Sequence, residues 1–439
     1  MTTNREKVLS QAMFLKRQGL CLRPDSARVV VRPFKPATEP RDLNPTDKTR
    51  ANHIVDRVLA LDVESAERQL AEVLENFQGR HRNLLATFEA RADDMEEVFA
   101  AHSAFSKTQR QLIGAYFMHE YSFEAAALLN PSIIAHPDQS GVPGGARRFI
   151  LSLRAVGEGH VSSLTFRSGI VAADGGVTVD PTIRLASIPR LQLHRLPGVV
   201  ADSIDVVFKA DEDISERVIF PITEAQANGI EDARFVEFDD DGRRTFYATY
   251  TAYSGTAIRS ELIETNDFVS FRMTPLKGTA ARNKGMALFP RKINGKYAMI
   301  GRQDNENLHL IYSNDLYSWG EGDVFLKPQF PWEFVQIGNC GSPIELDEGW
   351  LLLTHGVGPV RRYSIGAALL DKSDPSKVLA RSSEPLLRPE PSEREGYVPN
   401  VVYTCGAMRH NDRIILPYAV SDTYSCFATI EISALINAM

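Results

Sequence analysis

The sequence has few of the residues that build metal centres or disulfide frameworks. Its four cysteines, Cys21, Cys340, Cys405 and Cys426, are scattered without Cys-x-x-Cys spacing, and its ten histidines include no His-x-His or His-x-x-x-His pair. Metal sites and disulfide-rich folds use closely spaced ligands and cysteines. We therefore predict neither a metal site nor a disulfide framework, and we expect the cysteines to be buried as small apolar side chains.

An excess of positive charge and a long apolar run are also missing. Lys and Arg total 49 against 56 Asp and Glu, a net charge of −7, which argues against binding to nucleic-acid phosphates. No run approaches the 18 or so apolar residues of a membrane helix. Residues 1–16 lack the apolar core of a secretory signal. We expect no nucleic-acid or membrane partner and a cytoplasmic location.

The 439 residues leave room for two or three domains, and the first 120 differ in pattern from the rest. Apolar residues recur at three- and four-residue spacing between Asp47 and Phe117, which indicates helices. A proline-rich segment at 32–40 must be extended. We predict a mainly helical extension over residues 1–120. An exposed apolar stripe along residues 54–99 would favour a homo-oligomer formed through this extension.

Residues 121–439 consist of short β-type runs separated by Gly, Asn and Asp. The hexapeptide Asn266–Phe271 recurs as Asn314–Trp319, 48 residues further on, which is the size of a propeller blade. The 319 residues would make five blades of about 64 each. The sequence therefore predicts an all-β fold, a five-bladed β-propeller, with an N-terminal α-helical extension.

A propeller gathers the inner strands of all blades around one axis, so its polar site is built from residues far apart in the sequence. The candidates are Asn130, Arg154, the segment Glu231–Arg234, Lys284 with Arg302, His355, and Asp422. Neighbouring residues on a regular strand point to opposite faces, so only one of Glu231 and Asp232 is expected to face the axis. That acid would be a general acid while Arg234 or hydrogen bonds hold the other. The alternative is a solvated acidic turn.

Lys284 and Arg302 flank a predicted hairpin whose strands otherwise resemble core. Together with His355 they would form an anion pocket, because phosphate is best bound by converging cationic donors. The alternative for each residue alone is ordinary surface charge.

Several segments, in the same order along the chain, resemble glycoside hydrolase family 130, the β-mannoside phosphorylases and related β-mannosidases. The resemblance covers residues 122–436. Its segments are Leu129–Ile133, Gly229–Arg234, Lys284–Pro290, Ile293–Arg302, Gly349–Val357, Ile365–Asp371, Asp374–Arg381 and Val398–Val402. The helical first 120 residues fall largely outside it.

The resemblance implies a mechanism and a role for each candidate. Asp232 matches the family's catalytic aspartate, which protonates the glycosidic oxygen through a sugar hydroxyl while phosphate attacks the anomeric carbon with inversion, giving α-mannose 1-phosphate. Inorganic phosphate is then a co-substrate, and no cofactor or metal is required. Phosphate binding is assigned to Lys284, Arg302 and His355, and substrate binding to Asn130, Arg154, Glu231 and Asp422.

Three positions depart from the family pattern. Ala233 and Gln303 replace prolines, and Glu345 replaces a lysine common in phosphorylases. A glutamate near an anion site would weaken it, and Glu345 would suit the base of an inverting β-mannosidase, whose two carboxyl groups stand about 6.5–9.5 Å apart. We place the phosphorylase first because Lys284, Arg302 and His355 are retained, with β-1,2- or β-1,4-linked manno-oligosaccharides as substrates. The mannosidase is the main alternative; a non-catalytic glycan-binding propeller and a nucleotide-sugar-dependent transferase are remote ones.

Overall fold

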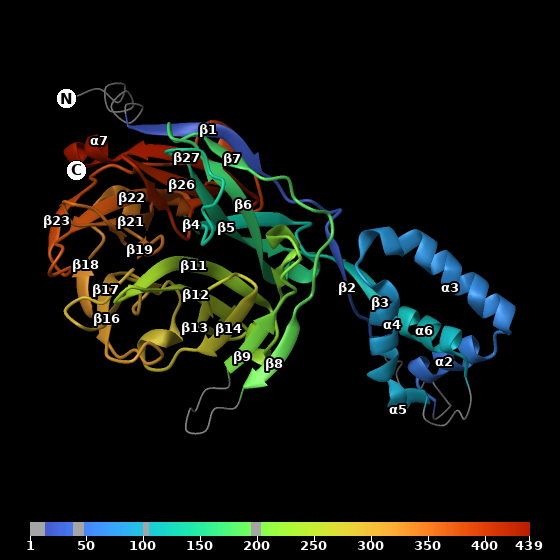
Figure 1. Ribbon diagram of the computed structural model, residues 1–439. Coiled ribbons are helices and arrows are strands. Elements are labelled where there is room, and N and C mark those ends of the chain that lie inside the picture. Colours follow the sequence, from blue (N-terminus) through green and yellow to red (C-terminus); the bar gives the residue numbers. More distant parts are fainter. Residues whose placement is uncertain (1–13, 38–47, 100–104, 195–202) are drawn as a thin grey trace. The chain divides into compact units, whose positions relative to one another are not determined.

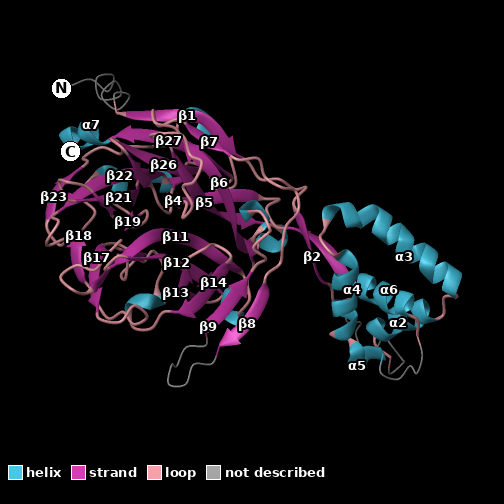
Figure 2. Cartoon of the chain, in the orientation of Figure 1, coloured by secondary structure: helices cyan, strands magenta, loops and turns pink. Residues whose placement is uncertain are grey.

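The computed structural model describes residues 14–37, 48–99, 105–194 and 203–439 (Figure 1). The chain divides into two compact units. One unit comprises Met1–Asp25, Glu124–Thr182 and Ile188–Met439, and the other comprises Ser26–Phe123 with Ile183–Ser187. Strands predominate in the first unit and helices in the second (Figure 2).

The helical unit contains α2 (Arg50–Leu59), α3 (Val63–Phe77), α4 (Leu84–Asp93), α5 (Glu96–Phe99) and α6 (Lys107–Tyr116), with β2 (Val29–Pro33) paired to β3 (Met118–Ser122). Side chains of Thr49, Asp62 and Ser106 accept backbone N–H bonds at the starts of α2, α3 and α6. Such caps satisfy donors that a helix leaves free at its N-terminus. The local sequence therefore determines where these helices begin.

The predicted exposed stripe along residues 54–99 is largely buried inside this unit. Val55, Val58, Ala92 and Met95 pack with Leu112 of α6 in one apolar cluster. Apolar residues on one face of a helix bury themselves against whatever element the fold supplies, and here α6 supplies it. The stripe thus gives no support to a subunit contact, and oligomerisation stays a prediction.

Five antiparallel strand groups make up the described part of the β unit. The first comprises β4 (Ala127–Ala135), β5 (Arg147–Val156), β6 (Ser162–Val171), β7 (Val177–Val179) and β10 (Val218–Ile219). The second comprises β11 (Gly229–Asp240), β12 (Arg243–Tyr253), β13 (Ile258–Thr265), β14 (Ser270–Pro275), β9 (Ser203–Val207) and β8 (Arg190–His194). A single parallel pair, Gly229 with Ser162, joins these two groups into one sheet.

The other three groups are separate sheets. The third contains β15 (Ala287–Leu288), β16 (Tyr297–Gly301), β17 (Leu308–Ser313) and β18 (Asp323–Leu326). The fourth contains β19 (Gln336–Asn339), β20 (Ile344–Glu345), β21 (Trp350–Val357), β22 (Tyr363–Leu370) and β23 (Val378–Arg381). The fifth contains β24 (Val402–Tyr403), β25 (Met408–His410), β26 (Arg413–Val420), β27 (Tyr424–Glu431) and β1 (Leu15–Leu22), and α7 (Ile432–Ala438) ends the chain. The prediction of a mostly β region is confirmed.

The hexapeptide repeat occupies matching places in two successive groups. Asp267 accepts the N–H of Val269 between β13 and β14, and Asp315 accepts the N–H of Tyr317 between β17 and β18. The last residue of each copy is a buried aromatic, Phe271 in the first and Trp319 in the second. The repeat is therefore a capped turn with a buried aromatic residue that joins the third and fourth strands of its group.

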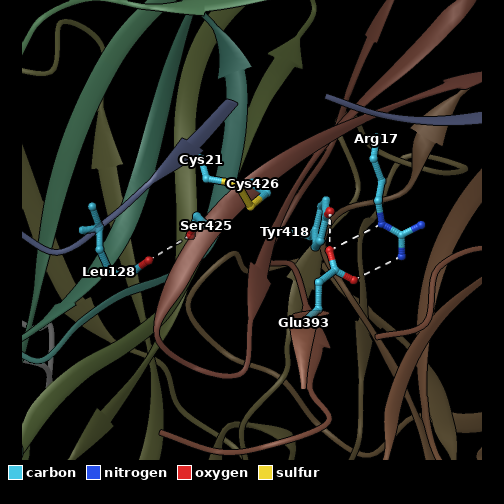
Figure 3. The surroundings of a disulfide bond; sticks show 7 residues. All are labelled: Arg17, Cys21, Leu128, Glu393, Tyr418, Ser425 and Cys426. Atoms are coloured by element: carbon cyan, nitrogen blue, oxygen red, sulfur yellow. Dashed lines mark hydrogen bonds and ion pairs between the residues drawn. A yellow bond between two sulfur atoms is a disulfide. The ribbon is translucent and has the colours of Figure 1, made fainter. Parts of the chain in front are cut away.

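The expectation for the cysteines is wrong at one pair. Cys21 of β1 and Cys426 of β27 lie opposite each other on neighbouring strands and form a disulfide (Figure 3). They are 405 residues apart in sequence, so spacing along the chain gives no sign of their pairing. Cys340 and Cys405 are buried and free, as expected.

The same pairing corrects the predicted boundary at residue 120. β1 belongs to the β unit, because it adds an outer strand beside β27, and Asp25 ends that N-terminal part. Among the residues that the structure describes, no helix is long and apolar enough to cross a membrane, and no cluster of three or more His, Cys, Asp or Glu is arranged to hold a metal ion.

Candidate active site

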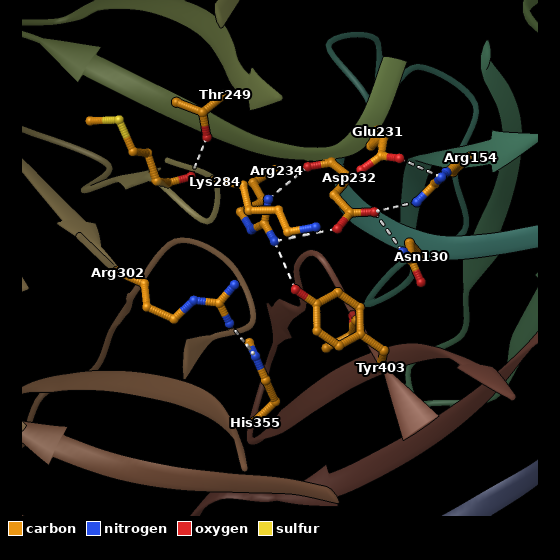
Figure 4. A network of polar contacts seen from close by, with 12 residues as sticks. Asn130, Arg154, Glu231, Asp232, Arg234, Thr249, Lys284, Arg302, His355 and Tyr403 are labelled. Carbon is orange, nitrogen blue, oxygen red and sulfur yellow. Dashed lines mark hydrogen bonds and ion pairs between the residues drawn. The ribbon is translucent and has the colours of Figure 1, made fainter. Parts of the chain in front are cut away.

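A cavity of about 240 Å³ in the β unit is lined by all eight residues to which the sequence analysis assigned a role in a phosphorylase. These are Asn130, Arg154, Glu231, Asp232, Lys284, Arg302, His355 and Asp422. Each of the five strand groups contributes, with Asn130 on β4, Asp232 on β11, Lys284 ahead of β15, Asn339 on β19 and Tyr403 on β24. The sequence therefore identified a set of residues that the tertiary structure brings together (Figure 4).

Two β-bulges aim the central residues into this cavity. The register of β4 shifts between Leu129 and Ser132, and that of β11 shifts between Glu231 and Arg234. Asn130 has φ 50° and Asp232 has φ 53°, the left-handed region that a bulge can require. Because β11 is irregular here, Glu231 and Asp232 both line the cavity, and the prediction that only one could face it is wrong.

Asp232 is the most heavily contacted carboxylate of the cavity. Its Oδ1 accepts a 2.5 Å hydrogen bond from Asn130 Nδ2 and lies 3.5 Å from Arg154 Nη1. Its Oδ2 lies 3.8 Å from Arg234 Nη2. Arg154 also donates a 2.7 Å bond to Glu231, so one guanidinium holds both acids (Figure 4).

The charges around Asp232 set its protonation state. Burial favours the neutral acid, but Arg154, Arg234 and Lys284, with the hydrogen bond from Asn130, outweigh it and hold the pKa of Asp232 below its usual value. The carboxyl is therefore ionised at neutral pH.

Asp422 behaves in the opposite way. Burial and the nearby negative charge of Asp232 raise its pKa to about 6, against the opposing charges of Arg154 and Arg361. Two acids in one cavity thus have pKa values displaced in opposite directions, a pattern typical of sites that transfer protons.

The other side of the cavity carries the basic groups. Arg302 Nη1 lies 3.3 Å from His355 Nε2, and because a guanidinium only donates, the imidazole nitrogen accepts. Burial, then the charges of Arg302 and Arg234, lower the pKa of His355 well below its usual value. His355, expected to be cationic, is therefore neutral at neutral pH, and it positions Arg302 instead of adding charge.

The sequence analysis missed four polar residues of the cavity, Asn339, Arg361, Tyr363 and Tyr403. Tyr403 accepts a 2.8 Å bond from Arg234 Nη2 and packs edge-on against His355 with ring centroids 4.9 Å apart. Asn339 is 1% exposed, and its amide contacts no hydrogen-bonding partner among the described residues. Asn339 and Tyr403 lie in sequence segments that resemble core strands. Only their positions on the strands that line the cavity identify them as site residues.

Glu345 does not join this cavity. Its carboxylate pairs with Arg291 at 2.8 Å and with Lys372 at 3.5 Å, and it lines a different hollow beside Pro343 and Arg409. Arg291 and Lys372 hold its pKa below the usual value. The hypothesis of Glu345 as a hydrolytic base is therefore wrong, because an acid in another cavity cannot activate water beside Asp232.

Comparison with known proteins identifies a family of carbohydrate-active enzymes and several relatives of this chain. The profile of the glycoside hydrolase family 130, described as beta-1,4-mannooligosaccharide phosphorylase, matches residues 200–439. A 1,2-beta-oligomannan phosphorylase of Thermoanaerobacter sp. (strain X514) is 37% identical over 217 residues, 48% of this chain and 70% of that protein. A beta-1,2-mannobiose phosphorylase of Listeria innocua is 34% identical over 231 residues, 50% of this chain and 63% of that protein.

Solved structures share the fold. The structure of the Listeria innocua beta-1,2-mannobiose phosphorylase with beta-1,2-mannobiose has a TM-score of 0.52 at 23% identity, covering 71% of this chain and 92% of that one. A family 130 structure, from a report of glycoside hydrolases that target beta-1,2 mannosidic linkages in Candida mannan, has a TM-score of 0.53 at 20% identity, covering 72% and 87%. The profile spans more than half of the sequence and contains most of the cavity residues, and the chain belongs to glycoside hydrolase family 130.

Proposed function

We propose that this protein is an inverting phosphorylase that cleaves β-mannosides and releases α-mannose 1-phosphate. The observation that carries the proposal is the convergence of one buried carboxylate, Asp232, with Arg234, Lys284 and Arg302 around a single cavity. The relatives named above are phosphorylases of β-mannosides, which supports the reaction type. The position of Glu345 in a separate hollow speaks against the mannosidase that used it as base.

In the proposed reaction the bond from the anomeric carbon to the glycosidic oxygen breaks and a bond to a phosphate oxygen forms on the opposite face. Asp232 supplies the proton, through a hydroxyl of the mannosyl unit, to the departing oxygen. Phosphate is its own nucleophile, so the cavity needs cationic donors in place of a second carboxylate base. Lys284 and Arg302 fill that role, with His355 holding Arg302.

Because Asp232 by itself is ionised at neutral pH, phosphate binding is proposed to help it gain the proton that a general acid needs. A phosphate anion beside Lys284 and Arg234 neutralises two of the charges that lower the pKa of Asp232. Its binding therefore raises that pKa, so that Asp232 takes up a proton when the nucleophile is in place. Asp422, whose pKa burial and the negative charge of Asp232 raise to about 6, is the group proposed to exchange that proton with it.

The same proposal includes the five-bladed propeller. Five strand groups each place a residue of one strand, or of the segment just before it, at the same cavity, which is the arrangement of blades around an axis. β1 beside β27 would then close the ring, since the first and last strands share the fifth blade. Phosphate and a manno-oligosaccharide are the proposed partners, with no cofactor or metal.

The test is a phosphate-dependence assay. Purified protein is incubated with β-1,2-mannobiose or β-1,4-mannobiose, with and without phosphate, and ³¹P and ¹H NMR follow the products. We expect α-mannose 1-phosphate and mannose only when phosphate is present. Free mannose at equal rates without phosphate would show a hydrolase, and no turnover of either disaccharide would contradict both activities.

A further inference from the structure

An aromatic pair that the mechanism does not use lies beside the turn that carries Asp422. Tyr397 is 61% exposed, and its ring lies 5.5 Å from the ring of His160 at an angle of 32°. The Tyr397 hydroxyl lies 3.2 Å from His160 Nδ1. The two residues come from segments 237 positions apart, so the fold and not the local chain brings them together.

Tyr397 is attached to the turn that carries Asp422. Its N–H donates a 2.9 Å bond to Thr423 Oγ1, and Val398 N–H donates a 3.0 Å bond to the carbonyl of Ser421. Asp422, between these two contacts, lines the cavity. Two hydrogen bonds donated by backbone N–H groups thus attach the segment of Tyr397 to the turn that places Asp422 in the cavity.

Contacts of the Asp422 turn show on which side of the cavity the aromatic pair lies. Asp232 lies between Arg154 with Asn130 on one side and Arg302 with His355 on the other (Figure 4). Leu128 N–H of β4 donates a 2.9 Å bond to the carbonyl of Thr423, so the turn of Asp422 lies against the strand of Asn130, on the side away from Arg302. Tyr397 and His160 share that side.

The inverting reaction indicates which part of the substrate lies on the Asp422 side of the cavity. The nucleophile attacks the face of the sugar opposite the departing group, so phosphate on the Lys284 and Arg302 side leaves the departing sugar on the other. A pyranose presents an apolar C–H face that packs well on an exposed aromatic ring, while its hydroxyls need hydrogen-bond donors such as Arg361.

We propose that Tyr397, held by His160, is the platform on which the leaving sugar of the substrate stacks, and that it sets the affinity for the acceptor sugar in the reverse reaction. The proposal rests on the proposed phosphorolysis. The ligand class is a neutral hexopyranoside, alone or as the next unit of an oligosaccharide.

Reverse-direction kinetics separate this role from the others. With α-mannose 1-phosphate as donor and β-1,2-mannobiose as acceptor, Tyr397→Ala should raise the KM for the acceptor by about tenfold and leave the KM for the donor unchanged. Tyr397→Phe keeps the ring and should restore most of the acceptor affinity. Tyr312→Ala, which removes a tyrosine exposed to 39% on β17, is the matched control and should match the wild type.

An acceptor KM unchanged in Tyr397→Ala, or donor and acceptor KM raised equally, overturns the platform. A calorimetric titration of β-1,2-mannotriose into Asp232→Asn, with and without Tyr397→Ala, needs no turnover. If the wild type shows no phosphorolysis at all, the proposed function fails. The titration alone then tests whether Tyr397 binds the sugar. Weaker binding with Tyr397→Ala then supports the platform, and equal binding overturns it.

Discussion

Asn130 Nδ2 donates a 2.5 Å hydrogen bond to Asp232 Oδ1, and both residues have positive φ at a bulge of an inner strand. The two residues come from different strand groups, so the hydrogen bond forms only when both bulges turn their side chains into the cavity. The bond fixes the carboxylate rotamer and favours its ionised form. An acid positioned in this way is oriented before substrate arrives.

Replacing Asp232 by Asn should remove turnover and leave the fold intact, because the amide fits the same space and cannot supply the proton. We expect kcat for phosphorolysis to fall by at least about a thousandfold, the upper part of the range for a general acid. Initial rates of α-mannose 1-phosphate release measure it. Asn130→Ala should lower kcat less, and a variant Asp232→Asn with wild-type kcat would refute the role.

Lys284→Met should weaken phosphate binding. The substitution removes a cation from the cavity, so the KM for phosphate should rise about tenfold or more, while the KM for the mannoside changes less. Steady-state rates at varied phosphate give the comparison. Lys292→Met is the control, since that ammonium pairs with Asp240 outside the cavity lining. Equal rises in both KM values would instead indicate a general loss of the site.

Glu345→Gln should leave phosphorolysis within about twofold of the wild type. Glu345 lies outside the cavity and its partly exposed pair with Arg291 contributes at most about 1 kcal/mol to stability. Activity assays and urea unfolding check the two parts. A tenfold loss of kcat without loss of folding would reinstate a catalytic role for this acid.

Asp422 makes stability depend on pH. Its pKa is about 6 in the folded chain, above the ordinary value, so the folded state holds a proton that the unfolded chain has already lost. Stability therefore falls as pH rises from about 4 to about 6, with a full cost of about 3 kcal/mol above that range. Asp422→Asn should be more stable than the wild type at pH 7.5 and equal to it near pH 3.5.

Urea unfolding across this pH range tests the claim. Asp347→Asn, which alters a side chain exposed to 91%, should follow the wild-type curve. If Asp422→Asn also follows that curve, the buried acid does not carry a raised pKa.

Breaking the link between β1 and β27 should destabilise the β unit. The Cys21–Cys426 disulfide closes a loop of 405 residues, and constraining so long a loop in the unfolded chain contributes about 2–5 kcal/mol. Dithiothreitol should lower the Tm of the wild type and leave Cys426→Ser unaffected. A wild-type Tm that does not respond to reduction would show that the bond contributes nothing.

The sequence by itself determined the strands, their turns and the chemical identity of the site. Alternating and apolar runs specify strands locally, and the hexapeptide at Asp267 and Asp315 repeats because each copy caps an equivalent turn. The charged candidates stood out because charge inside a core-like run is costly unless it has a function. The helix starts at Thr49, Asp62 and Ser106 are likewise local.

Only the tertiary structure decided what depends on strands that meet from far apart. A bulge directs both Glu231 and Asp232 into the same cavity, and the pairing of β1 with β27 joins Cys21 to Cys426. Glu345 lies in a different cavity from Asp232, the acid that it was expected to assist. The tertiary structure also made His355 neutral and gave Tyr403 and Asn339 a place at the site, since burial and neighbouring charge are properties of the packed molecule. The sequence specifies the type of each residue. The pKa of a side chain, the direction in which it points and its distance from other groups are set only when the folded sheets bring these residues to one cavity.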